Sequence, residues 1–319
     1  MRDRPPDSTL PNEGTIRSMK NKILVFDIGG SFIKFSLYSQ GEFMTKGKVA
    51  TPLDSLENLL IALKQIHSQF IDECEGIAVS MPGIVDSVTG HMVHGGSLRY
   101  INDINIIEVF KKAFHLPVAI ENDGKCAALG EVWRGSLQGI ADGVVLVVGT
   151  GMGGGIISQG KLLKGHHLSA GEFSFIRTNN EHADNVDYLL GMQGSSSVLA
   201  KTVAKAKGLP ADSITGEKVF KLIEEGDHTV QKIFREYCRN IATQIINLQT
   251  ILDPEKFVIG GGISANPLLV VTIKEELEKL YLHSILNFVR ADIEQSKLGN
   301  EANLLGAIYN YMQSQHLEV

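Results

Sequence analysis

Short apolar runs alternate with longer stretches in which apolar residues return every three or four positions. The first pattern is typical of buried strands and the second of amphipathic helices, so their alternation predicts an α/β fold. Strands are expected at 22–27, 32–38, 46–49, 76–81, 117–120, 144–148, 156–160 and 256–259. Helices are expected at 56–70, 124–134, 217–223 and 234–252, and from 195, 267 and 299 onward.

One predicted strand, 144–148, runs directly into the stretch 149–155, which holds five glycines in seven positions. Clustered glycines indicate positive φ angles or an approach too close for a Cβ atom, and phosphate is a common ligand of such loops. The consensus sequences of the dinucleotide-binding and Walker motifs both match residues in this region. The dinucleotide motif requires a helix after its glycines, but a strand is predicted there. The Walker motif requires a Ser or Thr hydroxyl where this chain has Leu162. We therefore expect a β-hairpin bend that offers N–H groups and the Thr150 hydroxyl to a phosphate. The alternative is a tight hairpin without a ligand.

Two further strands also end in glycine. Asp27, Gly29, Gly30 and Ser31 close the run at 22–28, and Gly260 to Gly262 follow the strand at 256–259. An acid beside two bare amide positions suits a hydrated Mg²⁺ next to nucleotide phosphates, because Mg²⁺ keeps its waters and needs few carboxylates. Asp27 could equally be an ordinary turn acid that bonds to the local backbone.

The strand at 117–120 runs into Glu121, Asn122 and Asp123, which precede a helix. Open α/β sheets bind ligands at the carboxyl ends of their strands, where a carboxylate can accept the proton of a substrate hydroxyl. The competing interpretation makes Asp123 the N-cap of the helix. The turn at Gly83 and the loop 94–100, which includes Ser97, either line a ligand pocket or lie on the surface.

The length and net charge of the chain limit the classes of protein to which it can belong. A chain of 319 residues favours two domains with a cleft between them, and a net charge of −6 disfavours nucleic acid as a partner. The sequence contains neither a membrane-length apolar run nor a signal peptide, which favours a cytoplasmic protein without a membrane partner. Residues 1–20 are typical of a disordered leader, an upstream start or a tag. Cys74, Cys126 and Cys238 have no metal-site spacing.

Four motifs, in this order, resemble the ROK family of sugar kinases and repressors, a branch of the actin/hexokinase superfamily. They are Asp27-Ile-Gly-Gly-Ser31, Glu121-Asn-Asp123, the stretch 149–155 and Gly260-Gly-Gly-Ile-Ser264. The resemblance implies two ribonuclease-H-like α/β domains around a cleft, the first formed by 21–118 and 303–319 and the second by 119–302. It also implies ATP and Mg²⁺ as cofactors, a small sugar or glycoside as substrate, and a homodimer.

The resemblance assigns roles to the candidate residues. The sugar would meet Asn122, Asp123 and Glu172, with Gly83 and Ser97 nearby, and Asp123 would be the catalytic base that activates the attacking hydroxyl. The nucleotide and its Mg²⁺ would meet Asp27, Gly29, Gly30, Ser31 and Lys34, the second phosphate loop Thr150, Gly151, Gly153 and Gly154, and the adenosine-side residues Gly261 and Gly262.

The sequence departs from the family at the Glu-x-Gly-His element, where Ser174 and Phe175 follow Glu172 and Phe173. The cysteine motif that binds zinc in the family is missing from 184–194, so we expect no zinc site. An apolar Phe175 in place of histidine predicts a pocket that accepts a substituted anomeric carbon, as in a β-glucoside. The alternatives are a kinase for fructose or an N-acylated hexosamine, and a non-catalytic sugar-sensing regulator. Because only about twenty residues precede Lys22, we expect no helix-turn-helix of the kind such a regulator carries.

Overall fold

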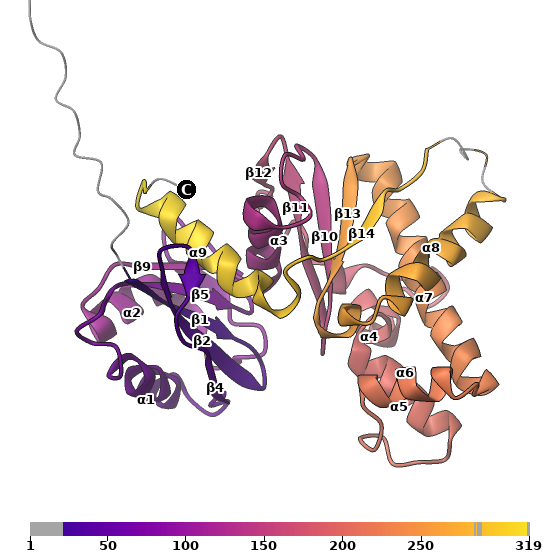
Figure 1. Cartoon of the computed structure of the whole chain (residues 1–319), viewed down its shortest axis with the longest axis horizontal. Coiled ribbons are helices and arrows are strands. Elements are labelled where there is room, and N and C mark those ends of the chain that lie inside the picture. The colour runs from indigo at the N-terminus through magenta and orange to yellow at the C-terminus, as the bar shows by residue number, and fades with distance from the viewer. Residues whose placement is uncertain (1–21, 284, 286–288, 318–319) are drawn as a thin grey trace, which may run out of the picture.

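The computed structural model describes residues 22–283, 285 and 289–317 (Figure 1). The expected leader at 1–20 lies outside the described residues. Two mixed sheets form the framework, and a small three-stranded sheet accompanies the first. The small sheet consists of β6 (Ile84–Val85), β7 (His91–His94) and β8 (Asn102–Asn105).

The first sheet has the strand order β3-β2-β1-β5-β9, with β4 paired to β2. Strands β1 and β2 form an antiparallel hairpin, whereas β5 and β9 add in parallel on the other side of β1. The strands are β1 (Lys22–Ile28), β2 (Phe32–Ser39), β3 (Glu42–Phe43), β4 (Gly47–Ala50), β5 (Cys74–Met81) and β9 (Val118–Asn122). Helices α1 (Leu56–His67) and α2 (Ile106–Phe114) supply core side chains to this sheet.

The second sheet repeats this plan, with the order β12-β11-β10-β13-β14. Its antiparallel hairpin is β10–β11, and β13 and β14 continue in parallel. The strands are β10 (Gly143–Val148), β11 (Met152–Ser158), β12 (Lys161–Leu162), β13 (Lys256–Gly260) and β14 (Ile293–Gln295). The helices beyond it are α4 (Leu190–Gln193), α5 (Ser196–Ala206), α6 (Gly216–Glu224), α7 (His228–Leu252) and α8 (Leu268–Tyr281).

Two helices, α3 (Asp123–Arg134) and α9 (Ala302–Ser314), lie between the sheets in Figure 1. They cross with their backbones in contact, because a Cβ atom on Gly306 would lie 1.7 Å from the Cys126 carbonyl oxygen. Leu304 and Ile308 of α9 pack with Val25 of β1, so the C-terminal helix completes the core of the first sheet. The close crossing holds the ends of the two sheets in a fixed relation.

The predicted α/β architecture and its glycine hairpin are confirmed, with shifted boundaries. Helix α7 begins at His228, before the expected start at 234, because Asp227 caps it through a bond from the Val230 N–H. The final helix begins at Ala302 after a 3-10 turn, Gly299–Glu301.

Candidate functional site

The bend between β1 and β2 presents open backbone N–H groups. Gly29 N donates to Phe32 O at 2.9 Å, and Thr51 fixes the turn through Gly29 O at 2.7 Å and Ser31 O at 3.0 Å. Gly30 and Ser31 are exposed, and their N–H groups have no acceptor among the described residues. Successive free N–H groups in a turn form a concave site for an anion.

The equivalent bend between β10 and β11 has the same property. Gly149 N donates to Gly151 O at 2.9 Å, while Ser196 and Ser197 at the start of α5 donate to the carbonyl oxygens of Gly149 and Thr150 at 2.7 and 2.8 Å. Within the described chain, the N–H groups of Thr150 and Gly151 have no acceptor. The bend is therefore anchored through its carbonyls and leaves its donors available.

Two of the remaining glycines, Gly154 and Gly155, serve packing, whereas a Cβ atom on Gly153 would meet only the Gly124 Cα, at 3.9 Å. A Cβ atom on Gly154 would lie 2.1 Å from the Val145 carbonyl oxygen, and one on Gly155 would lie 2.6 Å from Ala128 Cβ. From the other side, a Cβ on Gly124 would lie 2.5 Å from Gly154 N. None of the glycines in 149–155 has a positive φ angle. Contact with the Val145 carbonyl and the Phe173 ring therefore explains Gly154, and contact with α3 explains Gly155, whereas Gly149 and Gly151 have open space around them.

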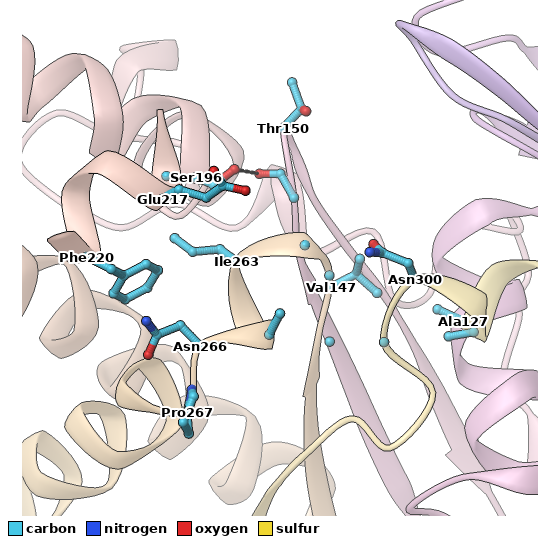
Figure 2. Close-up of a pocket in the computed structure, with 18 of the residues that line it drawn as sticks. Ala127, Val147, Thr150, Ser196, Glu217, Phe220, Ile263, Asn266, Pro267 and Asn300 are labelled. Carbon is cyan, nitrogen blue, oxygen red and sulfur yellow. Dashed lines mark hydrogen bonds between the residues drawn. The ribbon is translucent and has the colours of Figure 1, made fainter. Parts of the chain in front are cut away.

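A cavity of about 1110 Å³ opens between these strand ends, α6 and the start of α8. Figure 2 shows Thr150 at one end of its lining and Phe220, Asn266 and Pro267 at the other, with Ile263 between them. Among the residues predicted from sequence, Lys34, Thr150, Gly261 and Gly262 line it. Sequence analysis missed Glu217, Phe220, Asn266, Asn300 and Asn303, because they come from elements whose sequences carry no motif.

Asp27 contacts two residues that line this cavity and is itself almost fully buried, with an exposed fraction of 6%. Its Oδ1 accepts hydrogen bonds from Ser80 Oγ at 2.9 Å and Asn303 Nδ2 at 3.1 Å, and its Oδ2 lies 3.4 Å from Lys34 Nζ. Asn303 and Lys34 both line the cavity, so Asp27 is linked to it from two directions. The described residues contain no group of three or more metal-binding side chains.

Asn122, rather than Asp123, is the N-cap of α3. Its Oδ1 accepts from Lys125 N at 3.0 Å, and its Nδ2 donates to Gly83 O at 2.9 Å. The interpretation of Asp123 as the cap was therefore wrong, because Asp123 is already the first helical residue. Gly83 has a φ of +107°, which favours glycine. Ser97 lies near the first bend, since a Cβ on Gly30 would be 3.4 Å from its Oγ.

Asp123 is free of any cap function and sits among acids. Its Oδ1 accepts a hydrogen bond only from the neighbouring Gly124 N–H, at 2.8 Å, within the described residues. Burial, followed by the charges of Asp27 and Glu172, raises the pKa of Asp123 to about 6, against the opposing effects of the Gly124 N–H and Lys125. A carboxyl group with a pKa near neutrality is suited to exchange protons with a substrate.

Glu172 precedes a short 3-10 turn, Phe173–Phe175, and comes close to α3. Its Oε1 lies 3.0 Å from Nζ of Lys125, a buried lysine that sequence analysis missed. A lysine two positions after the candidate base, directly before the apolar run 126–129, was the signal that could have drawn attention to it. Phe175, at the end of the same turn, is 65% exposed.

A search of the described residues finds no helix that is both long and apolar enough to cross a membrane.

Comparisons with known proteins cover nearly the whole chain. The model of the ROK family matches residues 23–313. A β-glucoside kinase from Listeria monocytogenes is 35% identical over 92% of this chain and 99% of its own length. A ROK family protein from Streptococcus pneumoniae, solved with sucrose, is 29% identical with a TM-score of 0.81, covering 92% of this chain and 99% of its own. A ROK family glucokinase from Streptomyces griseus, solved with glucose and AMPPNP, is 26% identical with a TM-score of 0.79, covering 90% and 98%.

Proposed function

This chain belongs to the ROK family and is an ATP-dependent carbohydrate kinase, and on that premise we propose that it phosphorylates the 6-hydroxyl of a β-glucoside. The observation that carries the proposal is the position of Asp123. It shares its surroundings with Asp27, beside the first glycine bend, and with Glu172, beside the exposed Phe175. A sugar hydroxyl at Asp123 would therefore face the phosphate side of the cleft.

Asp123 acts as the general base in this proposal. A pKa of about 6 leaves its carboxylate mostly ionised at neutral pH, ready to accept the proton of the attacking hydroxyl. In phosphoryl transfer, positioning and charge neutralisation supply most of the catalysis, and base assistance supplies the rest. Asn122 keeps Asp123 in place because it caps α3 and binds the Gly83 carbonyl at the same time.

The two open bends hold the phosphates, and Asp27 holds Mg²⁺ through water. Mg²⁺ fits this site because it needs few carboxylates and keeps most of its waters, and Asp27 is a single carboxylate beside free N–H groups. When bound, Mg²⁺ neutralises charge on the transferring phosphoryl group. Lys34 adds a positive charge from the same hairpin, and the cavity around Phe220 and Asn266 receives the base of the nucleotide.

Phe175 favours a glycoside over a free sugar. It follows Glu172 on the same turn, and most of its ring is open to solvent, so an aglycone could pack against it. When a ligand covers an exposed aromatic ring, apolar surface is removed from water, which favours binding. Two more curated relatives, at 33% and 31% identity, are named β-glucoside kinases, which supports the same substrate class.

An assay that couples ADP release to a detectable signal tests the proposal across a panel of sugars. We expect kcat/KM for cellobiose to exceed that for glucose, fructose and N-acetylglucosamine. A strong preference for glucose would contradict the β-glucoside assignment while leaving the kinase intact. Absence of sugar-dependent ADP release over the whole panel would instead favour a sensor without catalysis.

A further inference from the structure

Lys125 is the most unusual charged residue in the described chain near the proposed site. Its exposed fraction is 2%, although lysine is almost never fully buried without a partner. It occupies the third position of α3, where the helix dipole disfavours a positive charge. The helix itself therefore gains nothing from a lysine at this position.

The side chain of Lys125 reaches from α3 to the turn that carries Glu172. Its Nζ lies 3.0 Å from Glu172 Oε1, and the two residues are 47 positions apart in sequence. The backbone of α3 is pressed against β11 here, because a Cβ on Gly155 would lie 3.4 Å from the Lys125 Cα. This contact fixes the start of the lysine side chain, and the ion pair fixes its end.

Only one of the two carboxylate oxygens of Glu172 takes part in the ion pair with Lys125. Oε1 is bound to Lys125, whereas Oε2 has no hydrogen-bond donor among the described residues. The Glu172 side chain is 20% exposed and the Lys125 side chain 3%, so the acid is the member of the pair that is open to solvent and hence to a ligand. Glu172 therefore has one carboxylate oxygen, Oε1, held by Lys125 and another, Oε2, that is available to a ligand.

We propose that Lys125 is a positioning residue for the sugar. It holds the Glu172 carboxylate so that Oε2 faces the sugar hydroxyls, and its positive charge offsets the repulsion between Glu172 and the neighbouring Asp123. The inference rests on the proposed function, in which Glu172 binds the sugar. Hydrogen bonds to a charged group are stronger than those between neutral groups, so losing the orientation of this acceptor weakens sugar binding.

Lys125→Met tests the inference, since it keeps a long side chain and removes the charge. We expect KM for the sugar to rise about tenfold or more, while KM for ATP changes by less than about twofold. A general loss of structure would instead lower kcat and alter both KM values together. Lys207→Met is the matched control, because it removes a lysine from an ion pair with Asp227, between α5 and α7, and should leave both KM values unchanged.

A double-mutant cycle with Glu172→Gln measures the coupling directly. If Lys125 acts through Glu172, Lys125→Met should add little to the sugar KM of the Glu172→Gln variant. Additive effects, or an unchanged sugar KM in Lys125→Met, would overturn the inference. Should Lys125→Met melt too low to assay, Lys125→Leu replaces it. Leucine also removes the charge and cannot donate to Glu172, so a raised sugar KM supports the inference and a wild-type sugar KM overturns it.

The two proposals fail in different ways. A wild-type protein that releases no ADP with any sugar contradicts the proposed function. If the wild type is active but substitution of Lys125 leaves the sugar KM unchanged, only the role of the lysine is contradicted.

Discussion

The two sheets share one strand order but carry different kinds of residue at the ends of their strands. In the first sheet, β1 carries the buried Asp27 near its end, and β9 is followed by Asp123. In the second sheet, the corresponding hairpin strand β10 is followed by Gly149, and β13 ends at Gly260 and is followed by Gly261. Both halves therefore supply bare backbone at a hairpin bend, and the first half also supplies carboxylates.

The difference reflects what each half meets in the proposed reaction. Phosphate oxygens repel carboxylates and accept hydrogen bonds from N–H groups, so glycine is favoured where the phosphates lie. Proton transfer and Mg²⁺ binding need carboxylates, and these come from the first sheet and from the start of α3. Three kinds of substitution test this division.

Replacing the catalytic base, Asp123, should have the largest effect on activity. Asp123→Ala is expected to lower kcat by about 10²–10⁴-fold, which is the usual contribution of a general base. Because Asn122 caps α3, the variant should melt close to the wild type. Asn122→Ala serves as the comparison and should lose about 1 kcal/mol of stability through the missing cap. A large drop in melting temperature for Asp123→Ala with activity retained per folded molecule would count against this account.

Adding a methyl group to the glycine stretch should separate packing from binding. Gly154→Ala places Cβ 2.1 Å from the Val145 carbonyl oxygen, so we expect the free energy of unfolding to fall by about 1–3 kcal/mol. Gly151→Ala meets no atom within 4 Å, so its stability should change by less than about 0.5 kcal/mol while KM for ATP rises. Chemical denaturation and ATP titrations measure both quantities. Equal destabilisation by the two variants would show that the bend is packed like the strand.

Truncating the exposed ring should have the smallest effect. Phe175→Ala is expected to lower kcat/KM for cellobiose roughly fivefold, since covering part of one aromatic ring is worth about 1 kcal/mol. The value for glucose should stay the same, because glucose has no aglycone. A parallel fall for both substrates would place Phe175 in the structure of the turn rather than in aglycone binding.

The strand ends could be predicted from sequence, because glycine and acids at the end of an apolar run carry a local signal. Asp27, Thr150 and Asp123 were proposed as site residues in this way, and the hairpin at 149–151 is confirmed. The pairing of Lys125 with Glu172 could not be found, since it depends on contacts between distant segments. The reason for Gly154 was also hidden, because it depends on the contacts of this glycine with the Val145 carbonyl of the neighbouring strand and with the Phe173 ring.

The most direct test of Asp123 as the base is the pH dependence of kcat/KM with cellobiose, measured for the wild type and for Asp123→Asn. Since the carboxylate form accepts the proton, the wild-type value should rise with pH and level off above an apparent pKa of about 6. The residual activity of Asp123→Asn should lack this rise. A rise with the same midpoint in Asp123→Asn would show that another group titrates and would contradict the account.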